Sequence, residues 1–174
     1  MVATTWMARA VAACPIGMVA VPQGAASADT KAYYDPVGDA TSMDIFRVRV
    51  AHRDAVSVRV RSAVPLKAGQ VYTFWVDAGR APRSTYHVSF RPNSDEGRLG
   101  VVRAFGGKTS RFVECSGMQS RADIFGDALV SIRIPRGCLG NPERVRVAVR
   151  FADESTGAVD WAPTSRTFGP WVAQ

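Results

Sequence analysis

The chain alternates apolar and polar residues most regularly between residues 42 and 62. Val48 and Val50 are separated by arginine, and after a short break three more valines alternate with serine and arginine. Strict alternation with a period of two residues is typical of a β-strand with one buried and one solvated face. The stretch Ser42–Ser62 therefore predicts a β-hairpin.

The apolar positions also predict the register of this hairpin, because directly opposed residues of an antiparallel pair share a face. If both apolar sets face one side, the opposed pairs are Val50 and Val56, Val48 and Val58, and Phe46 and Val60. The connection then takes about three residues, 52–54. On the outer face, this register sets Arg47 opposite Arg59, a like-charge pair that costs a few tenths of a kcal/mol unless an anion neutralises it.

Similar patterns predict strands along the rest of the chain. Residues 71–76 are apolar on both faces, which is typical of a central strand. Shorter segments bounded by Gly, Pro or Asp predict strands at 84–91, 98–105, 111–115, 128–134 and 143–151. Residues 119–127 fit either a loop or a helical turn. We therefore predict an all-β protein, an antiparallel β-sandwich of about seven to nine strands, Ig-like or jelly-roll-like.

The first 28 residues differ from the rest of the chain. Arg9 precedes an apolar run at 10–21, and Ala26-Ser27-Ala28 places small residues where signal peptidase cleaves. The run is too short to span a bilayer, which favours a signal peptide over a membrane anchor. We predict a signal peptide at 1–28 cleaved after Ala28, an extended lead-in at 29–41, and one β-sandwich domain at 42–174. The mature chain is then secreted and has no membrane span.

Two cysteines remain after removal of such a signal peptide, Cys115 and Cys138. Cysteines of an exported domain usually pair, so we predict one disulfide bond. The bond would close a loop of about 24 residues, which the chain-entropy model values at about 3 kcal/mol. The alternative is two buried free thiols. Two ligands alone would not hold zinc.

Positive charge is the main functional signal. The chain has 22 Lys and Arg against 15 Asp and Glu, a net charge of +7. The hairpin pattern gathers four arginines on one outer face: Arg47, Arg49, Arg59 and Arg61. A later strand carries three more arginines at alternate or nearly alternate positions: Arg144, Arg146 and Arg150. If that strand and the hairpin share a sheet, one face carries all seven arginines. Such a face suits phosphates or uronates of an anionic polymer, whereas the alternative is an ordinary solvated sheet face. Nucleic acid is disfavoured by export and by the lack of interleaved aromatic residues.

Acidic residues suggest a second kind of site. Asp35, Asp39 and Asp44 cluster before the first strand of the hairpin, and converging carboxylates are calcium ligands. The chain lacks the twelve-residue calcium loop with its closing glutamate, and turn formation is the alternative role. We expect no other cofactor. His52 and His87 stand apart from any nucleophile motif, so we expect a non-catalytic protein.

The chain resembles small exported proteins of high-GC Gram-positive bacteria in three places: residues 35–40 with Asp44-Ile45, the cysteine pair, and 160–163 with 168–171. Its opening is also similar to DOMON-like and related carbohydrate-binding sandwiches. That resemblance implies binding of sugars or haem, and some of the similar domains also bind calcium. A haem would need axial Met or His ligands, which we cannot place on facing strands. Tyr33, Tyr34, Trp161 and Trp171 are candidate sugar-binding rings, with core or edge cover as the alternative.

We therefore expect a module that binds cell-wall glycan or another anionic polysaccharide. A structural or protein-interaction domain at the cell surface is the second hypothesis. A secreted hydrolase, which would need a cleft with a perturbed carboxylate or histidine, is the third.

Overall fold

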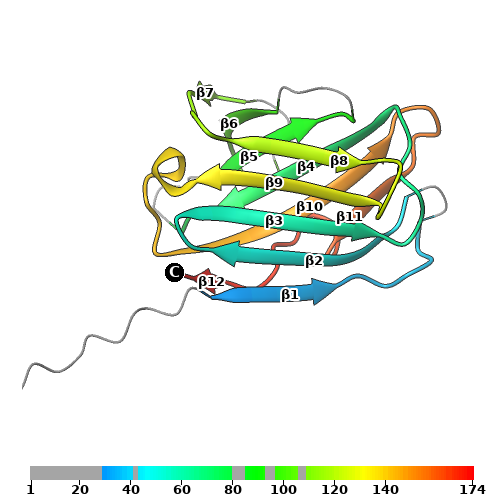
Figure 1. Cartoon of the computed structure of the whole chain (residues 1–174), viewed down its shortest axis with the longest axis horizontal. Helices are drawn as coiled ribbons and strands as arrows, with labels where there is room; N and C mark the ends of the chain where they lie inside the picture. The colour runs from blue at the N-terminus through cyan, green and yellow to red at the C-terminus, as the bar shows by residue number, and fades with distance from the viewer. Residues whose placement is uncertain (1–28, 41–42, 80–84, 93–96, 106–108) are drawn as a thin grey trace, which may run out of the picture.

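The protein is a sandwich of two antiparallel β-sheets (Figure 1). The computed structural model describes residues 29–40, 43–79, 85–92, 97–105 and 109–174. In spatial order, the five-stranded sheet contains β1 (Thr30–Tyr34), β2 (Ile45–His52), β3 (Ala55–Ser62), β9 (Leu129–Pro135) and β8 (Gln119–Asp123). The seven-stranded sheet contains β11 (Val159–Ala162), β10 (Arg144–Asp153), β4 (Gln70–Asp77), β5 (Thr85–Phe90), β6 (Arg98–Val102) and β7 (Arg111–Val113), and β12 (Val172–Ala173) pairs with β10.

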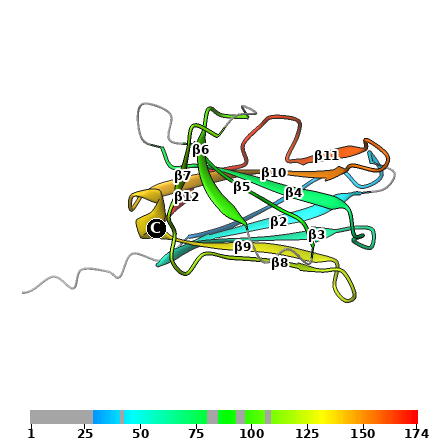
Figure 2. The ribbon, with the colours of Figure 1, turned by 90° about the horizontal axis from the view of Figure 1, so that it is seen from above.

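The two sheets lie face to face, as Figure 2 shows in a view along their planes. In strands such as β3, β5 and β9, alternate residues point inward and are buried, which is the burial that period-two alternation predicts. Val48, Val58 and Val60 line the inner side of the five-stranded sheet. Tyr72 of β4 and Phe151 of β10 face them, with ring centroids 4.6 Å apart. The predicted β-sandwich is therefore confirmed.

The described residues form twelve strands rather than seven to nine. Four short strands were not predicted: β1, β8, β11 and β12. Gln119–Asp123 is β8, so the alternative of a helical turn there is wrong. Three of the four strands lie at sheet edges, where exposed backbone pairs on one side only and the sequence pattern is correspondingly weak.

The hairpin forms where predicted, but its register is shifted. Val50 lies opposite Val58 and Val48 lies opposite Val60, so two residues, 53–54, connect β2 to β3. The shift arises because His52 joins the buried face opposite Val56. A register irregularity between residues 45 and 47 also exchanges the expected faces, so that Ile45 is buried and Phe46 is 39% exposed.

The predicted disulfide bond is present between Cys115 and Cys138, whose Cα atoms are 5.5 Å apart. It joins the segment after β7 to η1 (Arg136–Leu139), a short 3-10 helix at the end of β9. The predicted signal peptide at 1–28 lies outside the described residues. Among the residues that are described, no helix has the length and hydropathy needed to cross a membrane.

Candidate functional site

The four predicted arginines share the outer face of the five-stranded sheet. Arg47 lies opposite Arg61, and Arg49 lies opposite Arg59. The register shift therefore changes the pairing predicted for Arg47 but keeps the predicted face. We call these four residues the arginine face. Within the described part of the chain, none of them forms an ion pair with an acid.

Two neighbouring strands extend this charged surface. Arg121 of β8 and Arg133 of β9 belong to the same sheet. Ser131 lies between Arg59 and Arg121 in the strand register, and Arg133 lies opposite Ser57 of β3. Arg133 donates to Asp54 over 2.8 Å, an exposed ion pair at the end of the hairpin. Local sequence patterns did not assign Arg121 or Arg133 to this surface, because their position depends on which strands pair in space.

The outer face is hollowed beside these arginines. Three adjoining hollows of roughly 210 to 260 Å³ lie along it, and Arg59 lines all three. The first is lined by Arg47, Arg49, Arg59, Arg61 and Leu129. The second reaches β8 and β9 and adds Arg121 and Arg133, while the third adds Arg53 at the hairpin turn. The surface is thus a shallow basic track rather than one deep cleft.

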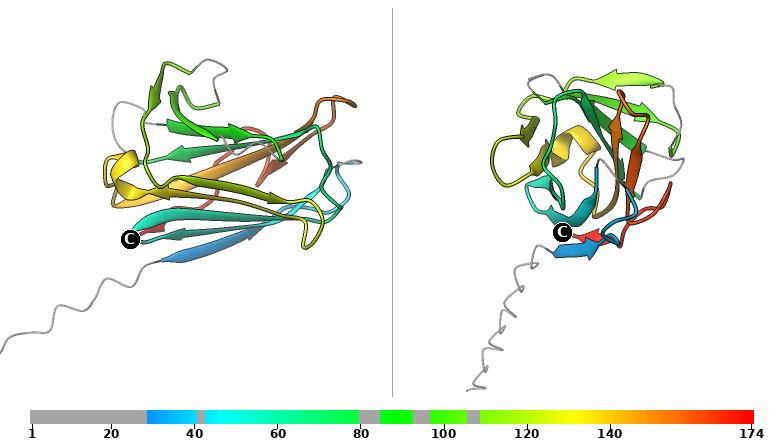
Figure 3. Two further views of the ribbon diagram at one scale, coloured as in Figure 1. Left: turned by 45° about the horizontal axis from the view of Figure 1, so that its top comes forward. Right: turned by 90° about the vertical axis from the view of Figure 1, so that its right-hand side faces the viewer.

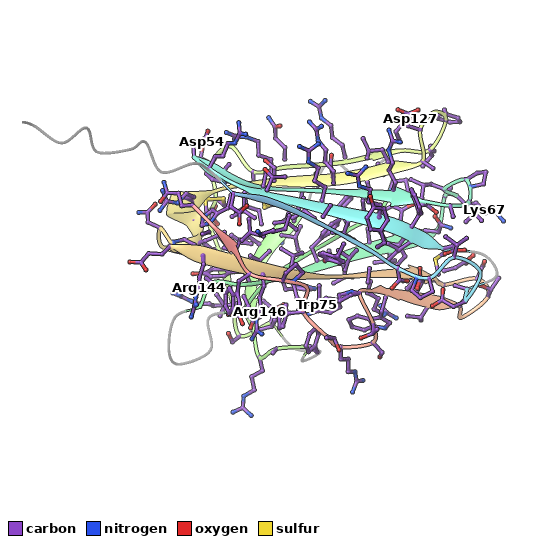
Figure 4. The ribbon with its side chains drawn as sticks, turned by 90° about the horizontal axis from the view of Figure 1, so that it is seen from below. Asp54, Lys67, Trp75, Asp127, Arg144 and Arg146 are labelled. Carbon is purple, nitrogen blue, oxygen red and sulfur yellow. A yellow bond between two sulfur atoms is a disulfide. The ribbon has the colours of Figure 1, made fainter. Side chains whose placement is uncertain are left out.

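The arginines of β10 do not belong to this track. Because β10 is in the seven-stranded sheet, the condition under which one face would carry all seven arginines is not met. In Figure 4, Arg144 and Arg146 lie with Trp75 on one side of the molecule. Asp54 and Asp127, which lie in turns of the five-stranded sheet, are on the opposite side. Arg146 also forms an ion pair with Asp77 over 2.8 Å, so its charge is partly neutralised.

Two of the candidate aromatic rings cover the outer side of the seven-stranded sheet. Trp161 stacks on Trp75 with ring centroids 4.9 Å apart. Trp171 lies under the guanidinium groups of Arg144 and Arg146, each 4.6 Å from its centroid. Both rings contact other side chains of the same chain. Trp161 therefore packs against a second small apolar cluster on this sheet, and Trp171 is covered by arginine side chains.

The other two candidate rings belong to β1. Tyr33 points inward, and its hydroxyl donates to the Val147 carbonyl over 2.9 Å. Burial raises the pKa of this hydroxyl well above its usual range. Tyr34 is exposed and lies beside the arginine face, with the Arg47 guanidinium 5.6 Å from its ring centroid. Of the four candidate rings, Tyr34 is therefore the one that lies exposed beside the basic track.

The predicted aspartates converge at one end of the sandwich with a fourth carboxylate. Oxygens of Asp35, Asp39 and Asp160 lie within 4.8 Å of one another. Asp44 lies beside them, and its Oδ2 accepts from the Gly38 amide over 2.7 Å. The cluster therefore contains all three predicted residues and adds Asp160 from β11.

The charge of this cluster is concentrated. Burial, together with the charges of Asp160, Asp39 and Asp44, raises the pKa of Asp35 to about 7. Burial also raises the pKa of Asp160, against hydrogen bonds from the Ile45 and Trp161 amides. Both pKa shifts reflect the free-energy cost of ionising several neighbouring carboxylates where burial excludes part of the solvent.

The two histidines belong to different sheets, His52 to β2 and His87 to β5. His52 is buried, and its Nδ1 lies 3.3 Å from the Val172 carbonyl oxygen. His87 is half-buried against the Trp75 ring. Burial lowers the pKa of both imidazoles. Within the described residues, no hydrogen bond joins either ring to a serine, threonine or carboxylate.

Comparison with known proteins finds no match to the chain among family models, curated proteins or solved structures. Inferences about function therefore depend on the two sites just described: the basic track on the five-stranded sheet and the aspartate cluster at the end of the sandwich.

Proposed function

We propose that this protein is an exported, non-catalytic module that binds an anionic polysaccharide of the cell envelope along the outer face of the five-stranded sheet. The observation that carries the proposal is the arginine face: four guanidinium groups in two opposed pairs, without acidic partners in the described residues. The disulfide bond supports export, since such bonds persist in oxidising compartments.

The opposed arginines favour a bound anion on energetic grounds. Like charges directly opposite one another destabilise a sheet by a few tenths of a kcal/mol or more. Acids across the strand would remove this cost, yet Arg47 faces Arg61 and Arg49 faces Arg59. A carboxylate or sulfate ester lying between two guanidinium groups would offset their repulsion, and it could accept two hydrogen bonds from each planar fork.

The spacing of the arginines suits a polymer rather than a small anion. Neighbouring strands lie about 4.8 Å apart, and alternate residues of one strand about 7 Å apart. Arg47 and Arg49 follow each other along β2, as Arg59 and Arg61 do along β3. The hollows continue past both rows, so successive acidic groups of one chain could each meet a guanidinium group.

The test is a binding titration of the disulfide-bonded protein with polygalacturonate, and with neutral dextran as the uncharged comparison. We expect R49A/R59A to bind polygalacturonate at least about tenfold more weakly at low salt, a loss of about 1.4 kcal/mol. Binding should also weaken between about 0.1 and 1 M salt, because the Debye length falls from about 10 to 3 Å.

The matched control is R103A/R111A. Both arginines are exposed and belong to the region of β6 and β7 in the other sheet, so this variant loses the same charge elsewhere. It should bind like the wild type. If both variants lost the same affinity for polygalacturonate, net charge alone would explain the binding and the specific face would be refuted. Equal binding of the wild type to neutral dextran would refute it as well.

A further inference from the structure

We propose that Asp35, Asp39 and Asp160, with Asp44 beside them, form a calcium site at the end of the sandwich where β1 leads into β2. The inference is independent of the basic track, which lies on the outer side of the sheet. It assigns the site to four carboxylates from two separate parts of the chain, the connection between β1 and β2 and the strand β11.

The fold brings these carboxylates together by pairing strands. Asp35 follows β1, and its amide donates to the Phe46 carbonyl, which keeps it against the start of β2. Asp160 of β11 lies opposite Phe151, a core residue, so its side chain faces the interior between the sheets. There it accepts from the amide of Ile45. Figure 3 shows β1 and the β10–β11 hairpin reaching the same end of the molecule.

Two of the carboxylates keep buried oxygens without partners. Asp35 is 6% exposed, and its Oδ2 has no hydrogen-bond partner in the described structure. Asp44 is 3% exposed, and its Oδ1 is likewise unpartnered. Leaving a buried charged oxygen unsatisfied costs several kcal/mol unless it is protonated or coordinated. Asp35 belongs to the three-oxygen group, so its buried and unpartnered carboxylate is an indication of a ligand that is separate from the clustering itself.

Turn formation alone does not account for this arrangement. Asp123 shows what an ordinary turn aspartate does: it is exposed, and its carboxylate accepts from the amides of residues 125, 126 and 127. Asp35, in contrast, is buried and accepts no hydrogen bond through its side chain in the described residues. The charges that act on it come from Asp160, Asp39 and Asp44, all of which are negative.

The size and charge of the cluster indicate calcium. Calcium binds oxygen at about 2.3–2.6 Å, so two oxygens on one ion are at most about 5 Å apart. The three oxygens fall within this limit, at 4.8 Å or less. Magnesium requires shorter bonds and a nearly octahedral shell, which it usually completes with several waters. Carboxylate oxygens without sulfur or imidazole also disfavour zinc and copper.

The first test is thermal unfolding of the purified full chain after chelation, with and without calcium chloride at about 1 mM, the range typical of extracellular calcium modules. We expect the midpoint temperature to rise by about 3–6 °C with calcium. Magnesium at the same concentration should give a smaller rise. In parallel, Tb³⁺ should bind and show luminescence sensitised by Trp161, the neighbour of Asp160, and calcium should displace it.

The variants D39N and D160N should lose both responses. Asp39 is exposed, and no hydrogen bond to its side chain is present in the described residues. D39N therefore remains informative if D160N, which changes the acceptor of the Ile45 amide, fails to fold. D127N removes an exposed acid at another turn and should respond like the wild type. No calcium-dependent shift and no displaceable Tb³⁺ signal in the wild type would overturn the proposal, as would an unchanged response in D39N.

Discussion

Removing the disulfide bond should destabilise the protein by an amount that follows from its position. Cys115 and Cys138 are 23 residues apart, and the loop between them contains β8 and the whole of β9. For a loop of this length, the chain-entropy model gives about 3 kcal/mol of stabilisation through the unfolded state. For a domain of about 150 residues, each kcal/mol corresponds to about 2–4 °C in the unfolding midpoint.

The variant C115S/C138S should therefore unfold about 6–12 °C below the wild type in a thermal scan followed by circular dichroism. Wild-type protein in dithiothreitol should match the variant, and the variant itself should not respond to dithiothreitol. A decrease smaller than about 2 °C would refute the reasoning, since it would mean that the bond does not restrict the unfolded chain as its loop length requires.

Two further predictions concern the region where β1 meets β2. The first is that, in chelator, the free energy of unfolding of the wild type relative to D35N falls as the pH rises from about 4 to 7, by up to about 4 kcal/mol. The sign follows because burial and the neighbouring carboxylates raise the pKa of Asp35 to about 7, so the folded state keeps a proton that the unfolded chain has already released; urea midpoints across this range measure it, and a flat difference would contradict it. The second is that Ile45→Ala costs about 2–5 kcal/mol because Ile45 is fully buried, whereas Phe46→Ala costs less than about 1 kcal/mol. Urea unfolding compares the two variants, and the reverse order would show that the phenylalanine faces the core, as the alternation alone suggested.

Local patterns predicted those parts of the fold that depend on neighbouring residues. The alternation in β3 indicated a strand and the face of each residue, because a strand's side-chain period follows from the backbone alone. The disulfide bond was also predicted, since two cysteines remain outside the predicted signal peptide and leave one pairing. The arginine face followed from the same alternation together with the hairpin, in which the two strands are neighbours along the chain.

Features that depend on distant contacts were missed. His52 shifts the hairpin register because it is buried beside the Val172 carbonyl, 120 residues away in sequence. Arg146 was grouped with the hairpin arginines because its strand has the same pattern, yet that pattern does not say which sheet the strand joins. Asp160 joins the aspartate cluster through a contact with Ile45 across 115 residues. Of the three predicted aspartates, Asp35 and Asp39 belong to the three-oxygen group, and Asp44 lies beside it.

The most direct test of the proposed function is to observe the arginine side chains while the ligand binds. Each Nε–H group gives its own signal in a ¹H–¹⁵N spectrum, so an acidic oligosaccharide such as tri-galacturonate can be titrated into labelled, disulfide-bonded protein. We predict that the signals of four residues shift together and saturate: Arg47, Arg49, Arg59 and Arg61. Those of Arg103 and Arg111 should stay in place. Shifts spread evenly over all arginines, or confined to Arg144 and Arg146 on the other sheet, would contradict the proposal.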